Sequence, residues 1–120
     1  MYCAVGVPAL TRRARTRNIS DSRLKRLYLQ LNKEWFGNKL PDDLVIRWAR
    51  LDKKTQAEAT SPKLIRIDAA LRKWPRTLKF AIIHEMAHIE LWHVVEDHHG
   101  DTWQRRMLQL AKAGAFRYLW

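Results

Sequence analysis

An apolar stretch at residues 77–92 reads TLKFAIIHEMAHIELW. Apolar side chains occupy nearly every side of a helix with this sequence, which is typical of a helix buried at the centre of a domain. Pro75 and Thr77 supply helix-start signals just before the apolar run. We therefore predict a buried helix from Thr77 to about Trp92, with the other elements packed around it.

The predicted buried helix contains an HExxH motif, His84-Glu85-Met86-Ala87-His88. Residues i and i+4 lie one above the other on a helix, so His84 and His88 can bind one metal ion. Glu85 would lean toward the open coordination position, where it could act as a general base. The alternative is a pair of hydrogen-bonded core histidines, but ionisable groups on so apolar a helix are costly to bury without a partner.

A catalytic zinc site needs a third protein ligand. The metzincin pattern fails because Leu91 and Val94 stand where it requires glycine and histidine, and no acidic residue follows Asp101. Glu90 and His93 would point away from the metal on the same helix. The third ligand is therefore expected in the region just before the last helix. The residues considered as third ligand are Glu90, His93, Glu96, Asp97, His98, His99 and Asp101.

Upstream of the buried helix, the pattern predicts one helix and a small sheet. Ser20, Asp21 and Ser22 offer N-caps, and Gly37-Asn38 would end the helix. Its apolar stripe is Leu24, Leu27, Tyr28, Leu31 and Trp35. Alternating residues at 44–51, 55–60 and 64–68 predict a three-stranded antiparallel meander.

A last helix is predicted after Gly100, with Asp101 as its N-cap and Gln104 closing a capping box. The side chains expected to face the core are Met107, Leu108, Ala111 and Phe116. The order is helix, sheet, buried helix, helix, which indicates a single α+β domain over residues 19–120. Residues 1–18 are predicted to be a basic, flexible tail.

The 120 residues carry 23 Lys and Arg against 12 Asp and Glu, a net charge of +11. Residues 1–79 account for +12 and residues 80–120 for −1. Such an excess favours a polyanionic partner such as nucleic acid, or an anionic membrane surface, although solubilising charges are the alternative. Trp74 could stack on an unpaired base or belong to the core. The predicted phosphate contacts are Arg12, Arg13, Arg15, Arg17, Arg23, Lys25, Arg26, Lys53, Lys54, Arg72, Lys73 and Arg76.

Several classes of protein are excluded. The longest apolar run of the helices, residues 80–83, is far too short to span a membrane. Cys3 is the only cysteine, so the chain has no internal disulfide and no thiolate zinc cluster. The N-terminus is not a secretory signal, although its arginines leave import into an organelle open. We expect an intracellular monomer without a membrane partner.

The HExxH motif and the later His99-Gly100-Asp101-Thr102-Trp103 together resemble the SprT-like (Spartan-type) metallopeptidase domain. Residues 35–41 resemble the family's segment between the first helix and the sheet, and the resemblance covers about residues 20–112. It implies a zincin-like, minimal gluzincin-like domain. It also implies one zinc ion on His84, His88 and His99, with His98 the rival third ligand. Glu85 would be the general base, and Trp103 would pack beneath the site.

The resemblance implies cleavage of proteins that are bound or crosslinked to DNA. Many members carry a cysteine zinc ribbon that this sequence lacks, so any DNA contacts must come from the domain or its basic tail. A peptide substrate could add to the edge of the strand at 64–68. The alternatives are a non-catalytic, zinc-stabilised nucleic-acid-binding module, or a YgjP/WLM-type metallopeptidase with a role away from DNA.

Overall fold

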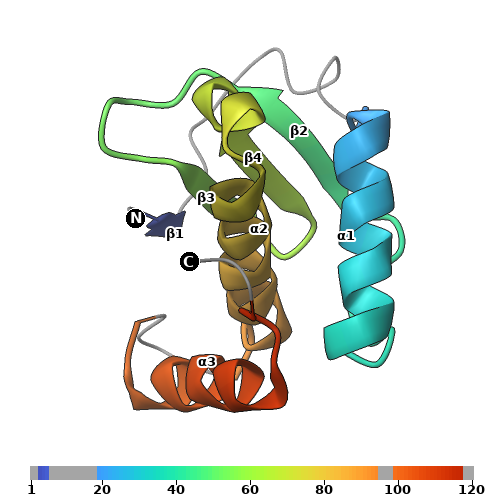
Figure 1. Ribbon diagram of the computed structural model, residues 1–120, viewed down its shortest axis with the longest axis vertical. Helices are drawn as coiled ribbons and strands as arrows, with labels where there is room; N and C mark the ends of the chain where they lie inside the picture. The colour runs from blue at the N-terminus through green and yellow to red at the C-terminus, as the bar shows by residue number, and fades with distance from the viewer. Residues whose placement is uncertain (1–2, 6–18, 95–98, 118–120) are drawn as a thin grey trace.

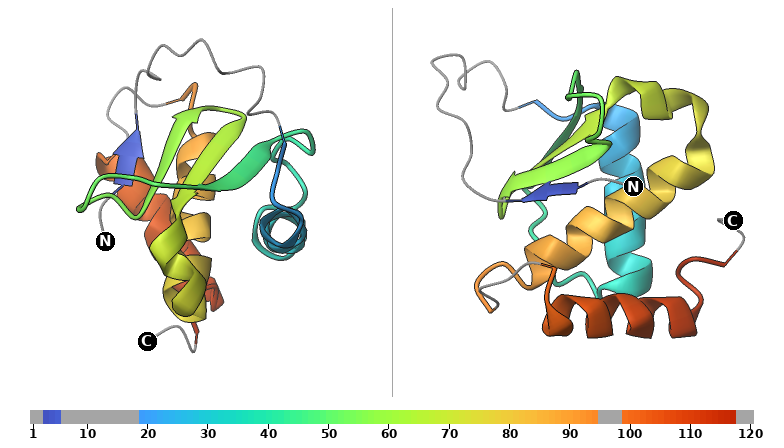
Figure 2. Two further views of the ribbon diagram at one scale, coloured as in Figure 1. Left: turned by 90° about the horizontal axis from the view of Figure 1, so that it is seen from above. Right: turned by 90° about the vertical axis from the view of Figure 1, so that its left-hand side faces the viewer.

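A computed structural model describes residues 3–5, 19–94 and 99–117 of the chain. Its strands are β1 (Cys3–Val5), β2 (Val45–Ala49), β3 (Ala57–Ser61) and β4 (Leu64–Asp68). Its helices are α1 (Ser22–Trp35), the 3-10 helix η2 (Ala69–Lys73), α2 (Pro75–Glu90) and α3 (Asp101–Ala113). Helices α1 and α2 lie on one face of the sheet, and α3 runs across the C-terminal end of α2 (Figures 1 and 2). This architecture confirms the prediction of a single α+β domain.

Helix α1 begins and ends as its sequence predicts. The Asp21 carboxylate accepts hydrogen bonds from the backbone N–H groups of Arg23 and Leu24, both at 3.0 Å, and so caps the first turn. After Trp35 the chain turns through Gly37 and Asn38, whose φ angles are both 59°. Glycine and asparagine tolerate this left-handed conformation, which ends the helix and sends the chain toward β2.

The sheet is mixed and four-stranded, with the order β1-β3-β4-β2. The predicted antiparallel meander is therefore wrong, because β4 lies between β2 and β3 and runs parallel to β2. A tight hairpin after Ser61 places β4 against β3. Residues 50–56 can then cross the end of β4, since seven residues reach about 23 Å and two strand spacings are about 10 Å.

Residues 3–5, predicted as part of a tail, form strand β1 instead. They pair in parallel with β3, with Cys3 opposite Ala57 and Val5 opposite Ala59. The other residues of the predicted tail lie outside the described residues. The strand at 64–68, on which we expected a peptide to dock, has neighbours on both sides and offers no free edge.

The core lies between the sheet and helices α1 and α2. Ile65 and Ile67 alternate on the inner face of β4 and are fully buried, together with Ile46 of β2. Every residue from Ala81 to Ile89 on α2 is buried as well. The predicted central helix is thus confirmed, and it ends at Glu90. Within the described part of the chain, none of the helices has the length and apolar character that spanning a membrane requires.

Helix α3 starts after Gly100 as predicted, but it differs from its prediction in its N-terminal cap and in the side chains that it buries. Gly100 is the N-cap, and no side chain caps the first turn, so Asp101 forms no capping box with Gln104. The Gln104 amide instead donates to the His99 carbonyl oxygen at 2.9 Å. Leu110 and Phe116 are buried. Two of the residues predicted to face the core are exposed instead, Leu108 and Ala111, because they lie outside the stripe of Trp103, Met107 and Leu110 that meets the core.

Candidate metal centre

Three histidines converge where α2 meets the start of α3. His84 and His88 lie one turn apart on α2, and His99 precedes α3. Their ring centroids are separated by 5.0 Å (His84–His88), 5.9 Å (His84–His99) and 4.7 Å (His88–His99). One ligand atom from each ring lies within 4.8 Å of the other two, a spacing from which the three could hold one metal ion. The structure therefore brings together the three histidines that the sequence analysis gave as the expected zinc ligands.

The cluster is buried on one side and open on the other. His84 is 7% exposed, and His88 and Glu85 have no exposed surface, whereas His99 is exposed. Helix α2 buries these polar residues because it packs on β3, β4 and α3. Solvent or a substrate can therefore reach the cluster from the side of His99.

Trp103 of α3 forms one wall of the cluster. Its indole stacks on the His88 ring, with the centroids 4.9 Å apart and the planes 7° from parallel. It meets His84 and His99 edge-on, at 4.7 and 5.2 Å. These contacts restrict how the imidazoles can turn, so Trp103 fixes the orientation of their nitrogen atoms. The resemblance to the family implied that this residue packs beneath the site.

His84 has the properties of a metal ligand. Both of its ring nitrogens are buried, and neither has a hydrogen-bond partner among the residues that the structure describes. Burial lowers the pKa of His84 from 6.5 to about 3, and the neighbouring His99 adds to the decrease. His84 is therefore neutral at physiological pH, and neutral imidazole is the form that binds metals. The donor set fits a zinc ion, and imidazoles also suit copper, iron and nickel.

A charged contact behind the cluster joins all three α-helices. The Arg106 guanidinium of α3 binds the Glu90 carboxylate of α2 with both arms, at 2.5 and 3.2 Å. It also donates to the Trp35 carbonyl oxygen of α1 at 3.1 Å and lies over the Phe36 ring. Sequence reasoning missed this contact, although an acidic residue at the end of an apolar helix is a signal that a cationic partner is near.

The other candidate ligands do not join the cluster. Glu90 pairs with Arg106, as its position on the far side of α2 requires. His93 and Asp101 are exposed and are not part of the metal-binding group found in the described part of the chain. Glu96, Asp97 and His98 lie outside the described residues. The alternative in which His98 is the third ligand therefore falls outside them as well.

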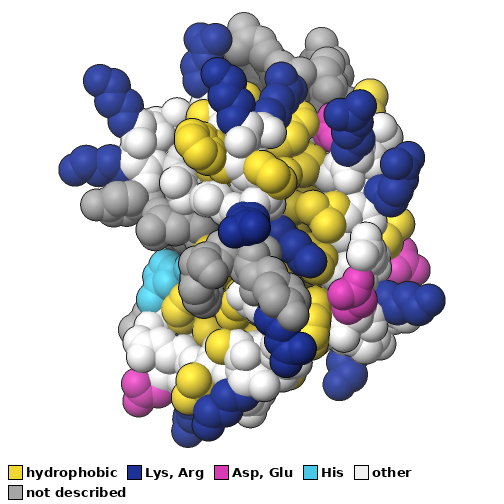
Figure 3. Space-filling view, viewed as in Figure 1, with side chains coloured by type: hydrophobic (Ala, Val, Ile, Leu, Met, Phe, Trp, Pro, Cys, Tyr) yellow, Lys and Arg dark blue, Asp and Glu magenta, His cyan; other side chains and the backbone are white. Residues whose placement is uncertain are grey.

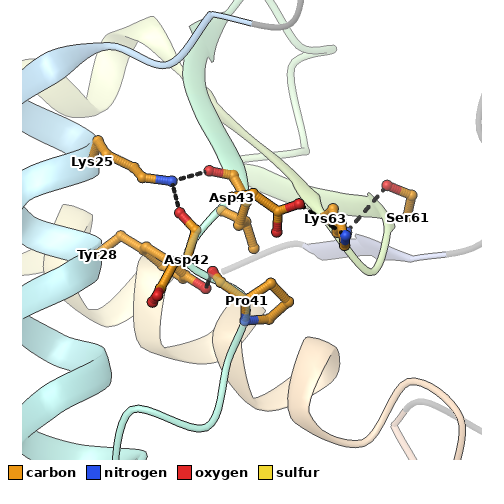
Figure 4. Close-up of polar contacts among 8 residues, drawn as sticks. Lys25, Tyr28, Pro41, Asp42, Asp43, Ser61 and Lys63 are labelled. Carbon is orange, nitrogen blue, oxygen red and sulfur yellow. Dashed lines mark hydrogen bonds and ion pairs between the residues drawn. The ribbon is translucent and has the colours of Figure 1, made fainter.

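The predicted phosphate contacts divide into three sets. Arg12, Arg13, Arg15 and Arg17 lie outside the described residues. The exposed set comprises Arg23 and Arg26 on α1, and Lys53, Lys54, Arg72, Lys73 and Arg76 around one end of the sheet. Lys25 instead has a structural role, because its ammonium donates to the carbonyl oxygens of Asp42 and Leu44 (Figure 4). Near it, the Tyr28 hydroxyl donates to the Pro41 carbonyl oxygen at 2.7 Å.

Comparison with known proteins gives one result. Residues 24–118, most of the chain, match the model of the SprT-like family. No curated protein and no solved structure matches the chain. The matched region includes the HExxH helix, the third histidine and the tryptophan beside them. The chain belongs to the SprT-like family.

Proposed function

We propose that this chain is a zinc-dependent endopeptidase with a zincin-like fold that, as a monomer, cleaves proteins bound or crosslinked to DNA. The observation that carries the proposal is the convergence of His84, His88 and His99, with Glu85 directly after the first of them. Membership of the SprT-like family supports the same chemistry. Three imidazoles and one accessible side are what a catalytic zinc site requires, whereas a structural zinc usually has four protein ligands.

His84, His88 and His99 would hold the zinc ion. When bound, zinc supplies a Lewis acid that polarises a peptide carbonyl and makes water acidic near neutral pH. The neutral state of His84 and the stacking of Trp103 on His88 hold the ligands ready for the ion. The exposed side of His99 leaves a path for the substrate.

Glu85 would move the protons of the reaction. It is fully buried on α2, one residue after His84. As general base it would take a proton from the attacking water, and as general acid it would pass that proton to the leaving amine. A peptide substrate must bind elsewhere than along β4, because β4 has no free edge.

The charge distribution supports the association with DNA. Most of the basic residues lie in the first two-thirds of the chain, and the site lies in the near-neutral last third. Positive charge beside a peptidase site would hold a polyanion near it and so concentrate the proteins that the polyanion carries.

The test is a cleavage assay with the full chain, zinc and a DNA-binding protein as substrate, with and without DNA and a chelator. We expect chelator-sensitive cleavage that DNA accelerates. Glu85→Gln should keep zinc and lose cleavage, while the matched control Asp101→Asn, an exposed carboxylate near the site, should cleave normally. A fully active Glu85→Gln variant would overturn the proposed role of Glu85.

Two further outcomes would point to the alternatives. Zinc and DNA binding with a substrate that stays intact under all conditions would indicate a non-catalytic, zinc-stabilised nucleic-acid-binding module. Chelator-sensitive cleavage that DNA never affects, by a chain that does not bind DNA, would indicate a metallopeptidase with a role away from DNA.

A further inference from the structure

A hollow of about 480 Å³ lies between α1 and the η2–α2 segment, toward the N-terminal end of α2. Its lining combines four apolar side chains with two arginines and one acid: Leu24, Leu27, Trp48, Leu78, Arg23, Arg72 and Asp21. Figure 3 shows hydrophobic side chains gathered over this upper part of the face, with Lys and Arg side chains around them. We call this hollow the Trp48 groove.

Flat, cation-rich surfaces border the Trp48 groove. The Arg72 guanidinium lies over the Trp48 indole, 4.9 Å from the ring centroid. Two residues later Trp74 is 61% exposed, although it is a large hydrophobic side chain. Trp74 lines a second hollow of about 320 Å³ with Pro75, Arg76 and Thr77. An indole left in solvent at this place has a surface available for stacking.

The cations around the Trp48 groove are not held in ion pairs within the described part of the chain. Arg72, Lys73 and Arg76 form no ion pair there, and neither do Lys53 and Lys54. The two lysines lie at the same end of the sheet as η2, since they follow β2, which is parallel to β4.

The carboxylates at this end of the sheet accept hydrogen bonds from backbone N–H groups. Asp21 caps α1, and Asp52 accepts from the N–H of Lys54. Asp68 accepts from the N–H groups of Leu51 and Ala70. The cations around the Trp48 groove therefore remain available to an external anion.

We propose that the Trp48 groove and the adjoining Trp74 surface bind single-stranded nucleic acid. Trp74 stacks on an unpaired base, while Arg72, Lys73 and Arg76 contact the phosphates. Single strands offer both an anionic backbone and exposed π faces, and base–aromatic stacking tolerates any sequence. An acidic peptide would satisfy the cations but would leave the exposed indole without a stacking partner. This site rests on the proposed association with DNA and assigns it to particular residues.

The position of the surface relates it to the histidine cluster. Thr77 and His84 are seven residues apart on α2, which is two turns, so they lie on nearly the same face of the helix. The axial separation is about 10 Å from Thr77 to His84 and about 16 Å from Thr77 to His88. A strand held at Trp74 would therefore bring a protein attached to it within reach of the candidate peptidase site.

The first test measures stacking by fluorescence anisotropy, with the full chain and a labelled oligothymidylate of about 20 nucleotides. Trp74→Ala should weaken binding about five- to 100-fold, and Trp74→Phe should retain most of the affinity. The matched control is Leu108→Ala, which also removes an exposed large hydrophobic side chain, on α3. Wild-type affinity in Trp74→Ala would overturn the proposed stacking.

The second test measures the phosphate contacts through salt dependence. Arg72→Ala, Lys73→Ala and Arg76→Ala should each reduce the slope of log K against log salt by about 0.7, whereas Lys112→Ala on α3 should not change it. Equal competition by polyglutamate of the same charge would overturn the choice of nucleic acid as the ligand.

The outcomes separate this inference from the proposed function. If the wild-type chain binds the oligonucleotide and all the groove variants bind it equally well, the inference falls and the association with DNA stands. If the wild-type chain binds no nucleic acid, both this inference and the proposed association with DNA are overturned. The cleavage assay without DNA then still tests the peptidase site.

Discussion

Arg106 and Glu90 form a two-armed ion pair that fixes α3 against α2, and the same guanidinium binds the Trp35 carbonyl oxygen of α1. The side chains are 23% and 20% exposed, so water screens the pair only in part. His99 and Trp103 both belong to the α3 side of the metal centre. Their position relative to His84 and His88 therefore depends on this contact.

Arg106→Ala should destabilise the fold and loosen the metal centre together. Removing one partner of a largely buried pair leaves the other uncompensated, and we expect a loss of about 1–3 kcal/mol in the free energy of unfolding. Zinc affinity should fall about tenfold because His99 is held less firmly. Urea unfolding and competition with a zinc-binding dye measure the two effects. The exposed neighbour Arg105→Ala is the control, and unchanged zinc affinity in Arg106→Ala would contradict the positioning role.

The candidate site was predictable where its geometry is local. His84 and His88 share one helix, so their approach follows from the i, i+4 spacing alone. His99 is not fixed by spacing, because it comes from a different segment; only the resemblance to a family selected it from several acids and histidines. The contact between Glu90 and Arg106 depends on how α2 and α3 cross, which no periodicity in the sequence encodes.

The sheet shows the same division between local and non-local information. The alternation of Ile65 and Ile67 predicted β4 with its observed bounds. The pairing of β4 with β2 was not predicted, since sequence neighbours β2 and β3 were assumed to be neighbours in space. Strand β1 was missed because three residues are too few to show an alternating pattern, and Cys3–Val5 were grouped with the arginine-rich stretch that follows them; they pair with β3 through backbone atoms.

His99→Ala should remove the third ligand and weaken zinc binding more than about 100-fold. The fold should survive in the absence of metal, since the His99 side chain is exposed. Zinc would then raise the Tm of the wild-type chain but not that of the variant. His93→Ala removes an exposed histidine outside the cluster and should leave the zinc-dependent shift intact. Loss of that shift in His98→Ala, with the shift retained in His99→Ala, would reverse the assignment of the third ligand.

Asn32→Ala should be among the most destabilising substitutions in α1. The Asn32 amide is fully buried, donates to the Leu40 carbonyl oxygen at 3.1 Å and accepts from the Leu40 N–H at 3.2 Å. Its loss would leave both backbone groups of Leu40 buried and unsatisfied, at a cost of about 2–3 kcal/mol. Urea unfolding measures this change. The next residue offers a control, because Lys33→Ala alters an exposed side chain of the same helix.

Trp103→Ala should weaken zinc binding without removing a ligand. The indole stacks on His88 and meets His84 edge-on, so its loss would free both rings to rotate. We expect about tenfold weaker zinc binding, comparable to the loss of other groups that orient metal ligands. Trp103→Phe keeps an aromatic face against His88 and should recover most of the affinity. A phenylalanine variant as weak as the alanine variant would show that Trp103 acts on the core and not on the imidazoles.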